Sequence, residues 1–227
     1  MVESVPLQIE PYRFDDDLIE AVVADGKTRF RIYSPTCACA VMGIGSLPDR
    51  ELDLAACIQD RLPLYRRRGG GCSVILDPGN VVVSTVFRVQ GIADTHRYFR
   101  AATEWMISAL QQLGFDHVVQ GGTSDLMLDD RKIGGSCVYR SKDFLYYSAS
   151  LLVDPRIELS ERYLRRPPRE PAYRRGRLHR DFMGRLSDEG SERRVEAFSA
   201  GLRKCLSVED LEQRLRSQPR FGSAATV

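Results

Sequence analysis

The segment from Arg66 to Asn80 places the strongest constraint on how this chain can fold. Three arginines run directly into three glycines at 66–71, and a turn sequence at 77–80 follows a short apolar run. Glycines allow positive φ and close backbone approach, and successive N–H groups in such a loop form a concavity for anions. Arginines add planar donors for carboxylate or phosphate. The segment predicts a cradle for an acyl-phosphate or nucleotide; a tight turn with a solvated basic flank is the structural alternative.

Several function classes find no support in the composition and motifs of the sequence. It contains neither the P-loop pattern G-x-x-x-x-G-K-[ST] nor the dinucleotide fingerprint G-x-G-x-x-G. A net charge of +2 gives no reason to expect a nucleic acid as partner. No apolar run approaches a membrane span or an export signal, so we expect a cytoplasmic protein without a membrane partner. Six cysteines form no C-x-x-C pair and have no histidine nearby, so we expect reduced thiols and no metal site.

Hydrophobic periodicity predicts an α+β domain with a mixed, mostly antiparallel sheet flanked by helices. The expected strands are 28–33, 73–76, 81–87, 117–120, 126–128, 133–140 and 144–152. Connections of hairpin length make most neighbouring strands antiparallel. The expected helices are 16–24, 49–62, 96–113, 178–186, 191–205 and 208–216. Pro63 ends the second of these helices and Gly114 the third, and an apolar stripe on the third predicts packing against the sheet.

Lysine is scarce in this arginine-rich chain, and one lysine stands beside paired glycines. The only lysines are Lys27, Lys132, Lys142 and Lys204. Lys132 follows an acidic turn at 129–130 and precedes two glycines at 134–135. A compact ammonium can hold a ligand carbonyl and a phosphate oxygen while charge develops on them. Its place at the start of a strand would fix it more firmly than a loop could. An exposed turn lysine is the alternative.

Four segments resemble the lipoate–protein ligase A family of the biotin/lipoate protein ligase superfamily. Residues 66–80 resemble R-R-x-S-G-G-G-A-V-x-H-D-x-G-N without a gap, and 124–126 resemble N-D-L. Residues 132–137 resemble K-I-S-G-S-A, where the family lysine contacts the acyl-adenylate, and 147–152 resemble H-H-G-T-L-L. The resemblance covers roughly residues 28 to 185.

The chain departs from the family pattern at several motif positions. Gly69 stands where the family has Ser, and Leu76 where it has His. Tyr147 and Ser148 replace the paired histidines, and Ser124 replaces the Asn of N-D-L. These departures concern substrate geometry rather than the fold.

The resemblance implies a catalytic domain over 1–185, with 186–227 as a short helical extension of the same domain. It implies a lipoate–protein ligase that converts lipoate and ATP to lipoyl-AMP and passes the lipoyl group to a lysine of a carrier domain. Mg²⁺ is inferred from the use of ATP. Lys132 is the expected catalytic residue. The expected substrate and nucleotide contacts are Arg67, Gly69, Gly70, Gly71, Gly79, Asn80, Ser124, Asp125, Gly135, Ser136, Cys137 and Ser150.

Other functions stay open at this point. An ATP-independent octanoyl or lipoyl transferase would use a cysteine thiolate, with Cys137 or Cys72 as candidates. A transfer-only domain would need a separate adenylating subunit. Biotin ligation shares the architecture, and a non-catalytic acyl-carrier- or nucleic-acid-binding module could keep the fold without the chemistry. The arginine-rich arm at 162–180 suits a nucleic acid or an acidic carrier domain, and the family resemblance favours the carrier.

Overall fold

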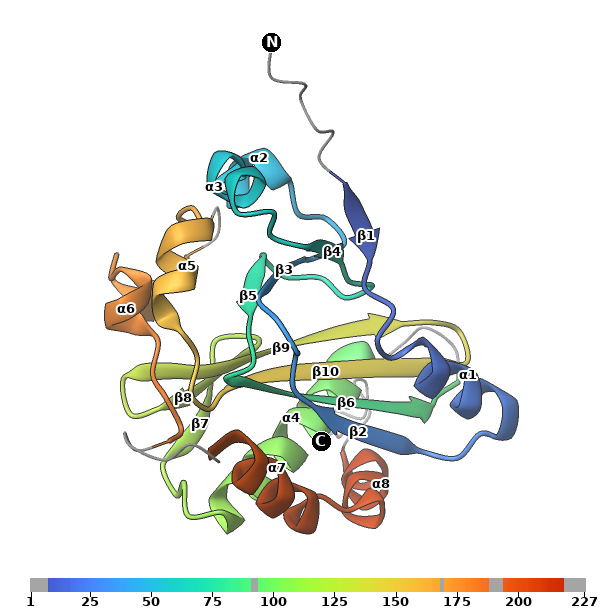
Figure 1. The fold of residues 1–227 in the computed structure, drawn as a ribbon. Helices are drawn as coiled ribbons and strands as arrows, with labels where there is room; N and C mark the ends of the chain where they lie inside the picture. The colour runs from blue at the N-terminus through green and yellow to red at the C-terminus, as the bar shows by residue number, and fades with distance from the viewer. Residues whose placement is uncertain (1–7, 91–93, 168–169, 188–193, 219–227) are drawn as a thin grey trace, which may run out of the picture.

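We describe a computed structural model of the chain, which places residues 8–90, 94–167, 170–187 and 194–218. The α+β class and the mostly antiparallel pairing are confirmed. The strands are divided between two sheets, however, where the sequence predicts one. Figure 1 shows the large sheet across the middle of the molecule, with the small sheet on one side of it and helices α4, α7 and α8 on the other.

The large sheet has six strands, and every neighbouring pair is antiparallel. Its order is β2 (Arg29–Tyr33), β6 (Asn80–Arg88), β10 (Phe144–Leu152), β9 (Arg131–Arg140), β8 (Asp125–Leu128) and β7 (Val118–Gly121). The short connections between β7, β8, β9 and β10 dictate this pairing, because a tight turn can join only antiparallel neighbours.

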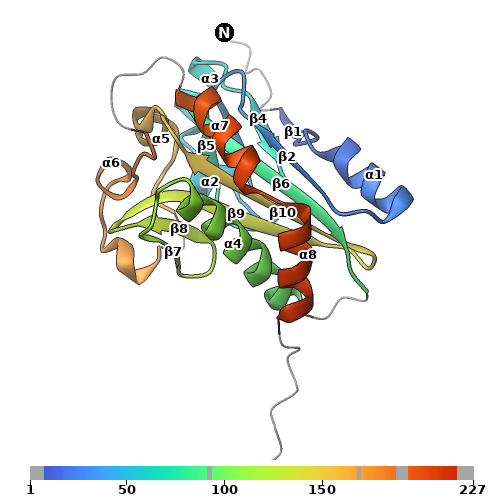
Figure 2. The same ribbon diagram turned by 90° about the horizontal axis from the view of Figure 1, so that it is seen from below.

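The main core lies between the large sheet and three helices. They are α4 (Thr95–Gln112), α7 (Arg194–Cys205) and α8 (Val208–Ser217), and Figure 2 shows all three over one face of the sheet. Alternate residues of β10 point into this core, and Leu145, Tyr147 and Leu151 are fully buried there. Trp105 of α4 is 1% exposed, and its indole Nε1 donates to the carbonyl of Ser207 at 2.8 Å. The helices predicted over 191–205 and 208–216 are confirmed over 194–205 and 208–217, and 188–193 lie outside the described residues.

The small sheet is built from strands too short to show a clear alternation. Its order is β1 (Ile9–Pro11), β4 (Leu64–Arg66), β3 (Cys39–Met42) and β5 (Val74–Leu76), with β4 parallel to both of its neighbours. Its core contains Met42 and Leu52, both 0% exposed. Strand β4 leads straight into the Arg-Gly segment, so this sheet sets the position of that loop.

The predicted helix over 49–62 is wrong, because a distant segment interrupts it. The structure has two short helices, α2 (Pro48–Glu51) and α3 (Leu54–Gln59). Between them, Leu52 forms a β-bridge with Leu164, just after α5 (Ile157–Tyr163). Asp53 then caps α3 by accepting from the amide of Ala56 at 3.0 Å.

The remaining helices lie at opposite ends of the large sheet. Helix α1 (Asp16–Asp25) ends at Gly26 with φ 75°, and this helix agrees with the prediction. The helix predicted over 178–186 is much shorter, since α6 spans only His179–Phe182 after the 3-10 turn η1 (Ala172–Arg174). It stops because Met183 bridges to Lys132, whose carbonyl also accepts from the amide of Gly184 at 2.8 Å. None of the described helices combines the length and apolar character needed to cross a membrane.

Candidate active site

The face of the large sheet that looks toward the small sheet carries small and polar residues. On β9 and β10 the register pairs Gly135 with Ser150 and Cys137 with Ser148. Since side chains alternate between faces, these four positions share one face. All four are half-buried, whereas the opposite face is packed with apolar side chains. We call this strip of small residues, at 135, 137, 148 and 150, the floor.

Lys132 stands at one end of the floor and is held by a carboxylate. Its Nζ lies 2.8 Å from Oδ1 of Asp125, with 26% and 13% of the two side chains exposed. A β-bulge at Ile133 places Lys132 opposite Met127 on β8. A Cβ added at Gly135 would lie 3.4 Å from Nζ, so the lysine stem lies over that glycine. The structure thus brings Lys132 and Asp125, two of the expected site residues, into direct contact.

Tyr173 completes this group. It lies in the arginine-rich arm at 162–180, the basic arm, and was not among the predicted site residues. Its hydroxyl donates to Oδ2 of Asp125 at 2.8 Å, so the carboxylate bridges tyrosine and lysine. Burial raises the pKa of Tyr173, and the phenol stays a donor at neutral pH. A Cβ added at Gly122 would lie 3.1 Å from that hydroxyl. The sequence held one signal for this contact, the paired glycines at 121–122, because glycines in a strand often mark a site where another chain segment approaches closely.

The arginines of the Arg-Gly segment hold the loop by its carbonyls. Arg67 donates to the carbonyls of Val41 at 2.8 Å, Gly70 at 2.7 Å and Cys72 at 2.9 Å. Arg66 Nη1 donates in the same way to the loop at 43–46. Arg67 therefore orients the loop from within. Carbonyls turned toward a guanidinium leave the neighbouring amides free to face elsewhere.

The glycine amides are the groups left for a ligand. The amides of Gly70 and Gly71 make no hydrogen bond to any residue in the described ranges, and both glycines are exposed. Gly71 has φ 89°, a conformation natural to glycine. Two adjacent open amides beside a left-handed residue are the elements of an anion-binding nest.

A buried carboxylate, missed in the sequence analysis, supports the loop from below. Glu51 is 7% exposed, and its Oε2 accepts from the amide of Ser73 at 2.6 Å and from its hydroxyl at 2.7 Å. The same oxygen accepts from Ser46 Oγ at 2.9 Å, and this hydroxyl lies 3.3 Å from the carbonyl of Gly71. Glu51 therefore ties both sides of the Gly-rich loop together.

Gly79 and Asn80 lie in a closed turn. Asn80 is 1% exposed, and its Oδ1 accepts from the amide of Asp77 at 2.8 Å. Asp77 accepts from the amides of Gly79 and Arg156, at 2.7 and 2.8 Å. A Cβ at Gly79 would lie 1.9 Å from the carbonyl of Asp154. In this structure the turn anchors the segment after β10.

Ser124 and Ser136, two other predicted contacts, are hydrogen-bonded to each other. The amide and the hydroxyl of Ser136 both donate to the carbonyl of Ser124, at 2.8 and 3.0 Å.

Cys137 is packed under the loop and is not an activated nucleophile. A Cβ added at Gly69 would lie 2.7 Å from its Sγ. Burial raises the pKa of the Cys137 thiol, and the Arg67 guanidinium only opposes that rise. The thiol is therefore neutral at neutral pH. The resembling motifs have Ser at the position of Gly69 and Ala at the position of Cys137. In this chain the larger side chain of the contact is therefore at 137, whereas in the motifs it is at the position of 69.

We expect substitutions at Gly69 and Cys137 to have non-additive effects on the free energy of unfolding. Gly69→Ser alone should destabilise the protein by about 1–3 kcal/mol, because its Cβ overlaps Sγ. Cys137→Ala alone should cost about 1 kcal/mol or less and leave acyl transfer intact. The double variant should recover most of the loss, with a coupling of about 1 kcal/mol or more in urea unfolding. Additive effects of the two substitutions would contradict the contact.

A cavity of about 470 Å³ lies against the outer side of the Arg-Gly segment. Tyr12, Asp16, Ile44, Arg67 and Arg68 contribute to its wall. Arg68 pairs with Asp16 at 3.0 Å, so one cation at the rim is already neutralised. The described residues contain no group of three or more His, Cys, Asp or Glu side chains that could hold a metal ion.

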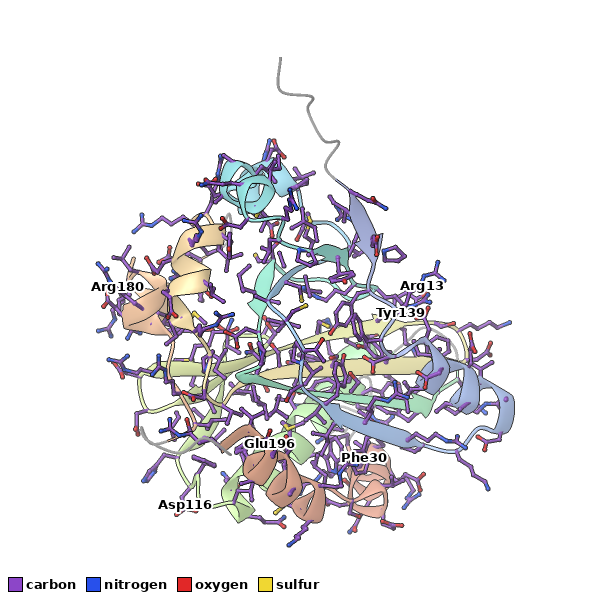
Figure 3. All side chains as sticks on the ribbon, in the orientation of Figure 1. Arg13, Phe30, Asp116, Tyr139, Arg180 and Glu196 are labelled. Carbon is purple, nitrogen blue, oxygen red and sulfur yellow. The ribbon has the colours of Figure 1, made fainter. Side chains whose placement is uncertain are left out.

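The basic arm is partly neutralised by contacts within the chain. Arg162 pairs with Asp60 and Arg177 with Asp130, at 2.5 and 3.1 Å. Arg174 is buried, while Arg180 lies at the outer edge of α6, as Figure 3 shows. Arg169 lies outside the described residues. The arm thus packs over the Lys132 end of the sheet and leaves only part of its charge for a partner.

Comparison with known proteins adds a family match. The profile of the lipoyl protein ligase A/B catalytic domain matches residues 9–207. The lipoate-protein ligase LplJ of Bacillus subtilis is 25% identical over 134 residues, which cover 59% of this chain and 40% of LplJ. The chain therefore spans less than half the length of this curated relative.

Two solved structures share the fold. One comes from Thermoplasma acidophilum and is described as a bi-partite lipoate protein ligase and its E2 lipoyl domain. It has a TM-score of 0.66 and 21% identity, and the alignment covers 92% of this chain and 89% of that one. The other is lipoate-protein ligase A bound with ATP, with a TM-score of 0.65 and 21% identity over 87% of this chain and 85% of that chain.

Proposed function

Since the chain belongs to the family of lipoyl protein ligase A/B catalytic domains, we propose that it activates lipoate with ATP and transfers the lipoyl group to a lysine of a carrier domain. One observation carries this proposal. The Lys132–Asp125 pair stands on a floor of half-buried small residues, and the Gly-rich loop with two open amides packs against that floor at Cys137. An ammonium and an amide nest on the same floor suit a mixed anhydride of a carboxylate and a phosphate.

In the first step, a carboxylate oxygen of lipoate forms a bond to the α-phosphorus of ATP, and pyrophosphate leaves. The amides of Gly70 and Gly71 would receive phosphate oxygens. Arg67, bonded to the carbonyls of Val41 and Gly70, would keep those amides in place. The catalytic contribution is positioning and preorganised charge, since no reorganisation is needed at the moment of reaction.

In the second step, the amine of the carrier lysine attacks the acyl carbonyl, AMP leaves, and the amine loses a proton to solvent. Lys132 would polarise the carbonyl and neutralise the phosphate in both steps. Asp125 would orient the ammonium, with Tyr173 holding the carboxylate from its other side. Mg²⁺ would enter with ATP as the counter-ion of its phosphates.

The partner in this proposal is a lipoyl carrier domain, docked on the arginine-rich arm beside Lys132.

We further propose that 1–185 and the extension 186–227 form one domain. The contacts of α4 with α8 support this, since Arg97 Nη2 donates to the carbonyl of Leu215 at 2.7 Å. An accessory subunit is proposed as a second possibility for the adenylation step. The bi-partite ligase with the same fold supports considering it.

A direct test of adenylation uses the full chain with lipoate and Mg-ATP, without any carrier. We expect lipoyl-AMP bound to the protein, detected by mass spectrometry, and pyrophosphate released in equal amount. Lipoyl-AMP that forms only after a second protein is added would support the accessory subunit. Acyl transfer from an octanoyl thioester without ATP would favour the transferase alternative, which the neutral, packed thiol of Cys137 argues against.

A further inference from the structure

Asp15 is a buried acid whose position is not explained by the helix beside it. It stands at the N-cap of α1, where an aspartate normally accepts from the first helical amides, but its side chain makes no cap bond. It turns inward instead and is 4% exposed. Its Oδ2 accepts from Ser84 Oγ at 2.7 Å, Tyr146 Oη at 2.8 Å and Tyr33 Oη at 3.2 Å.

The second oxygen of this carboxyl has no hydrogen-bond partner. Oδ1 of Asp15 is buried and unpaired among the residues that the structure describes. Leaving such an atom unsatisfied costs about 1–3 kcal/mol, and buried polar atoms are paired in most proteins. Burial also raises the pKa of Asp15, against the opposing effect of the hydroxyls and of Arg31. The fold therefore keeps a costly buried carboxyl at this position.

The floor connects this acid to the reacting end of the candidate site. It starts beside Lys132 and runs over Gly135 and Ser150 to Cys137 and Ser148. The hydroxyl of the half-buried Ser148 lies 3.1 Å from that of Ser84, which in turn donates to Asp15. In Figure 3, Tyr139 and Arg13 mark the α1 end of the sheet, and Arg180 marks the opposite end, where α6 packs against the start of β9.

The end of the floor nearest α1 is therefore polar. Tyr33, Tyr146, Ser84 and Ser148 all present hydroxyls there, and Tyr12 adds another through its 3.1 Å contact with Tyr33. An apolar chain end placed against the half-buried Ser148 would take its hydroxyl out of water without supplying a new partner, which is unfavourable. Since Ser84 donates to Asp15, the hydroxyl of Ser148 can donate to Ser84 and accept from a chain end that carries a hydrogen-bond donor.

We propose that the Ser148–Ser84–Asp15 relay selects an acyl substrate with a hydrogen-bond donor, a hydroxyl or an amine, at the end remote from its carboxylate. This inference rests on the proposed function, because it takes the floor between Lys132 and Ser148 to be the acyl channel. Chemistry at the Lys132 end is unchanged. Lipoate remains a substrate, but one that binds more weakly than an acid of similar length with a polar end.

Calorimetric binding of free acids to the full chain tests this proposal without ATP or carrier. The wild type should bind omega-hydroxyoctanoate about tenfold more tightly than octanoate, the effect of one hydrogen bond to a charged or buried acceptor. Asp15→Leu should bring the ratio of the two dissociation constants close to one. Ser148→Ala, which leaves Asp15 in place, should reduce the ratio by several fold. The matched control Asp17→Asn changes a neighbouring exposed acid and should keep the ratio.

Two outcomes would overturn the proposal. One is a wild type that binds octanoate as tightly as its hydroxylated form, and the other is a ratio that neither Asp15→Leu nor Ser148→Ala changes. The ratio is insensitive to a partly unfolded fraction, because both acids meet the same protein. Adenylate formation is assayed separately with Mg-ATP. A selective preference without adenylate would count against the ligase and leave the selectivity established.

Discussion

Lys132→Ala should lower acyl transfer by about 10²–10³-fold and leave the folded protein intact. The expected size is that of removing one preorganised group from developing charge in a site shielded from water. Folding should survive because the side chain is only partly buried and pairs with one carboxylate, Asp125. Transfer from presynthesised lipoyl-adenylate to a carrier domain should be measured along with ATP-driven transfer, since Lys132 is assigned to both steps.

The matched control is Lys142→Ala, which removes the same side chain from the exposed turn between β9 and β10. It should retain the wild-type rate. Far-ultraviolet circular dichroism and the urea midpoint would show whether the Lys132 variant is folded. A folded Lys132→Ala protein that acylates the carrier at the wild-type rate would contradict the assignment of this residue.

Gly43→Ala should displace the Gly-rich loop and impair adenylation. A Cβ at this position would lie 2.0 Å from the carbonyl oxygen of Gly71, so one backbone segment has to move. Overpacking of this kind costs about 1–3 kcal/mol of unfolding free energy. A shift of about 1 Å at a positioning loop can cost about a hundredfold in rate. Lipoyl-AMP formation and urea unfolding should therefore both be measured.

Gly45→Ala supplies the control two residues away. Nothing lies within 4 Å of a Cβ at Gly45, and its backbone is not left-handed. This variant should therefore match the wild type in stability and adenylation. If Gly43→Ala forms lipoyl-AMP as fast as Gly45→Ala, the position of the loop does not control the chemistry.

The strands of the large sheet could be predicted from the sequence, because they rest on local patterns, and the contact between Lys132 and Asp125 lies within one of its hairpins. The acidic turn at 129–130 makes a hairpin, and the β-bulge at Ile133 turns Lys132 to the face on which Asp125 lies. Tyr173 could not be found in this way. Its contact with Asp125 spans 48 residues and depends on how the arm folds back. The arm itself looks like surface charge in the sequence, although Arg174 proves to be buried.

The small sheet and the loop chemistry needed the structure for a different reason. Strands of three or four residues carry too few alternations to be recognised. The helix expected over 49–62 fails because Leu52 pairs with Leu164, a contact that helical periodicity does not encode. The motif predicts a ligand cradle over 66–71, but the side chains of Arg66 and Arg67 face backbone carbonyls and Arg68 pairs with Asp16. The open groups are the amides of Gly70 and Gly71.

The most direct test of the central claim is the intact mass of a lipoyl carrier domain after incubation with this chain, lipoate and Mg-ATP. We predict a gain of one lipoyl group on a single lysine, which requires ATP and is lost with Lys132→Ala. The contradicting result is a carrier that stays unmodified with lipoate and ATP and with presynthesised lipoyl-adenylate, but gains an acyl group from an octanoyl thioester.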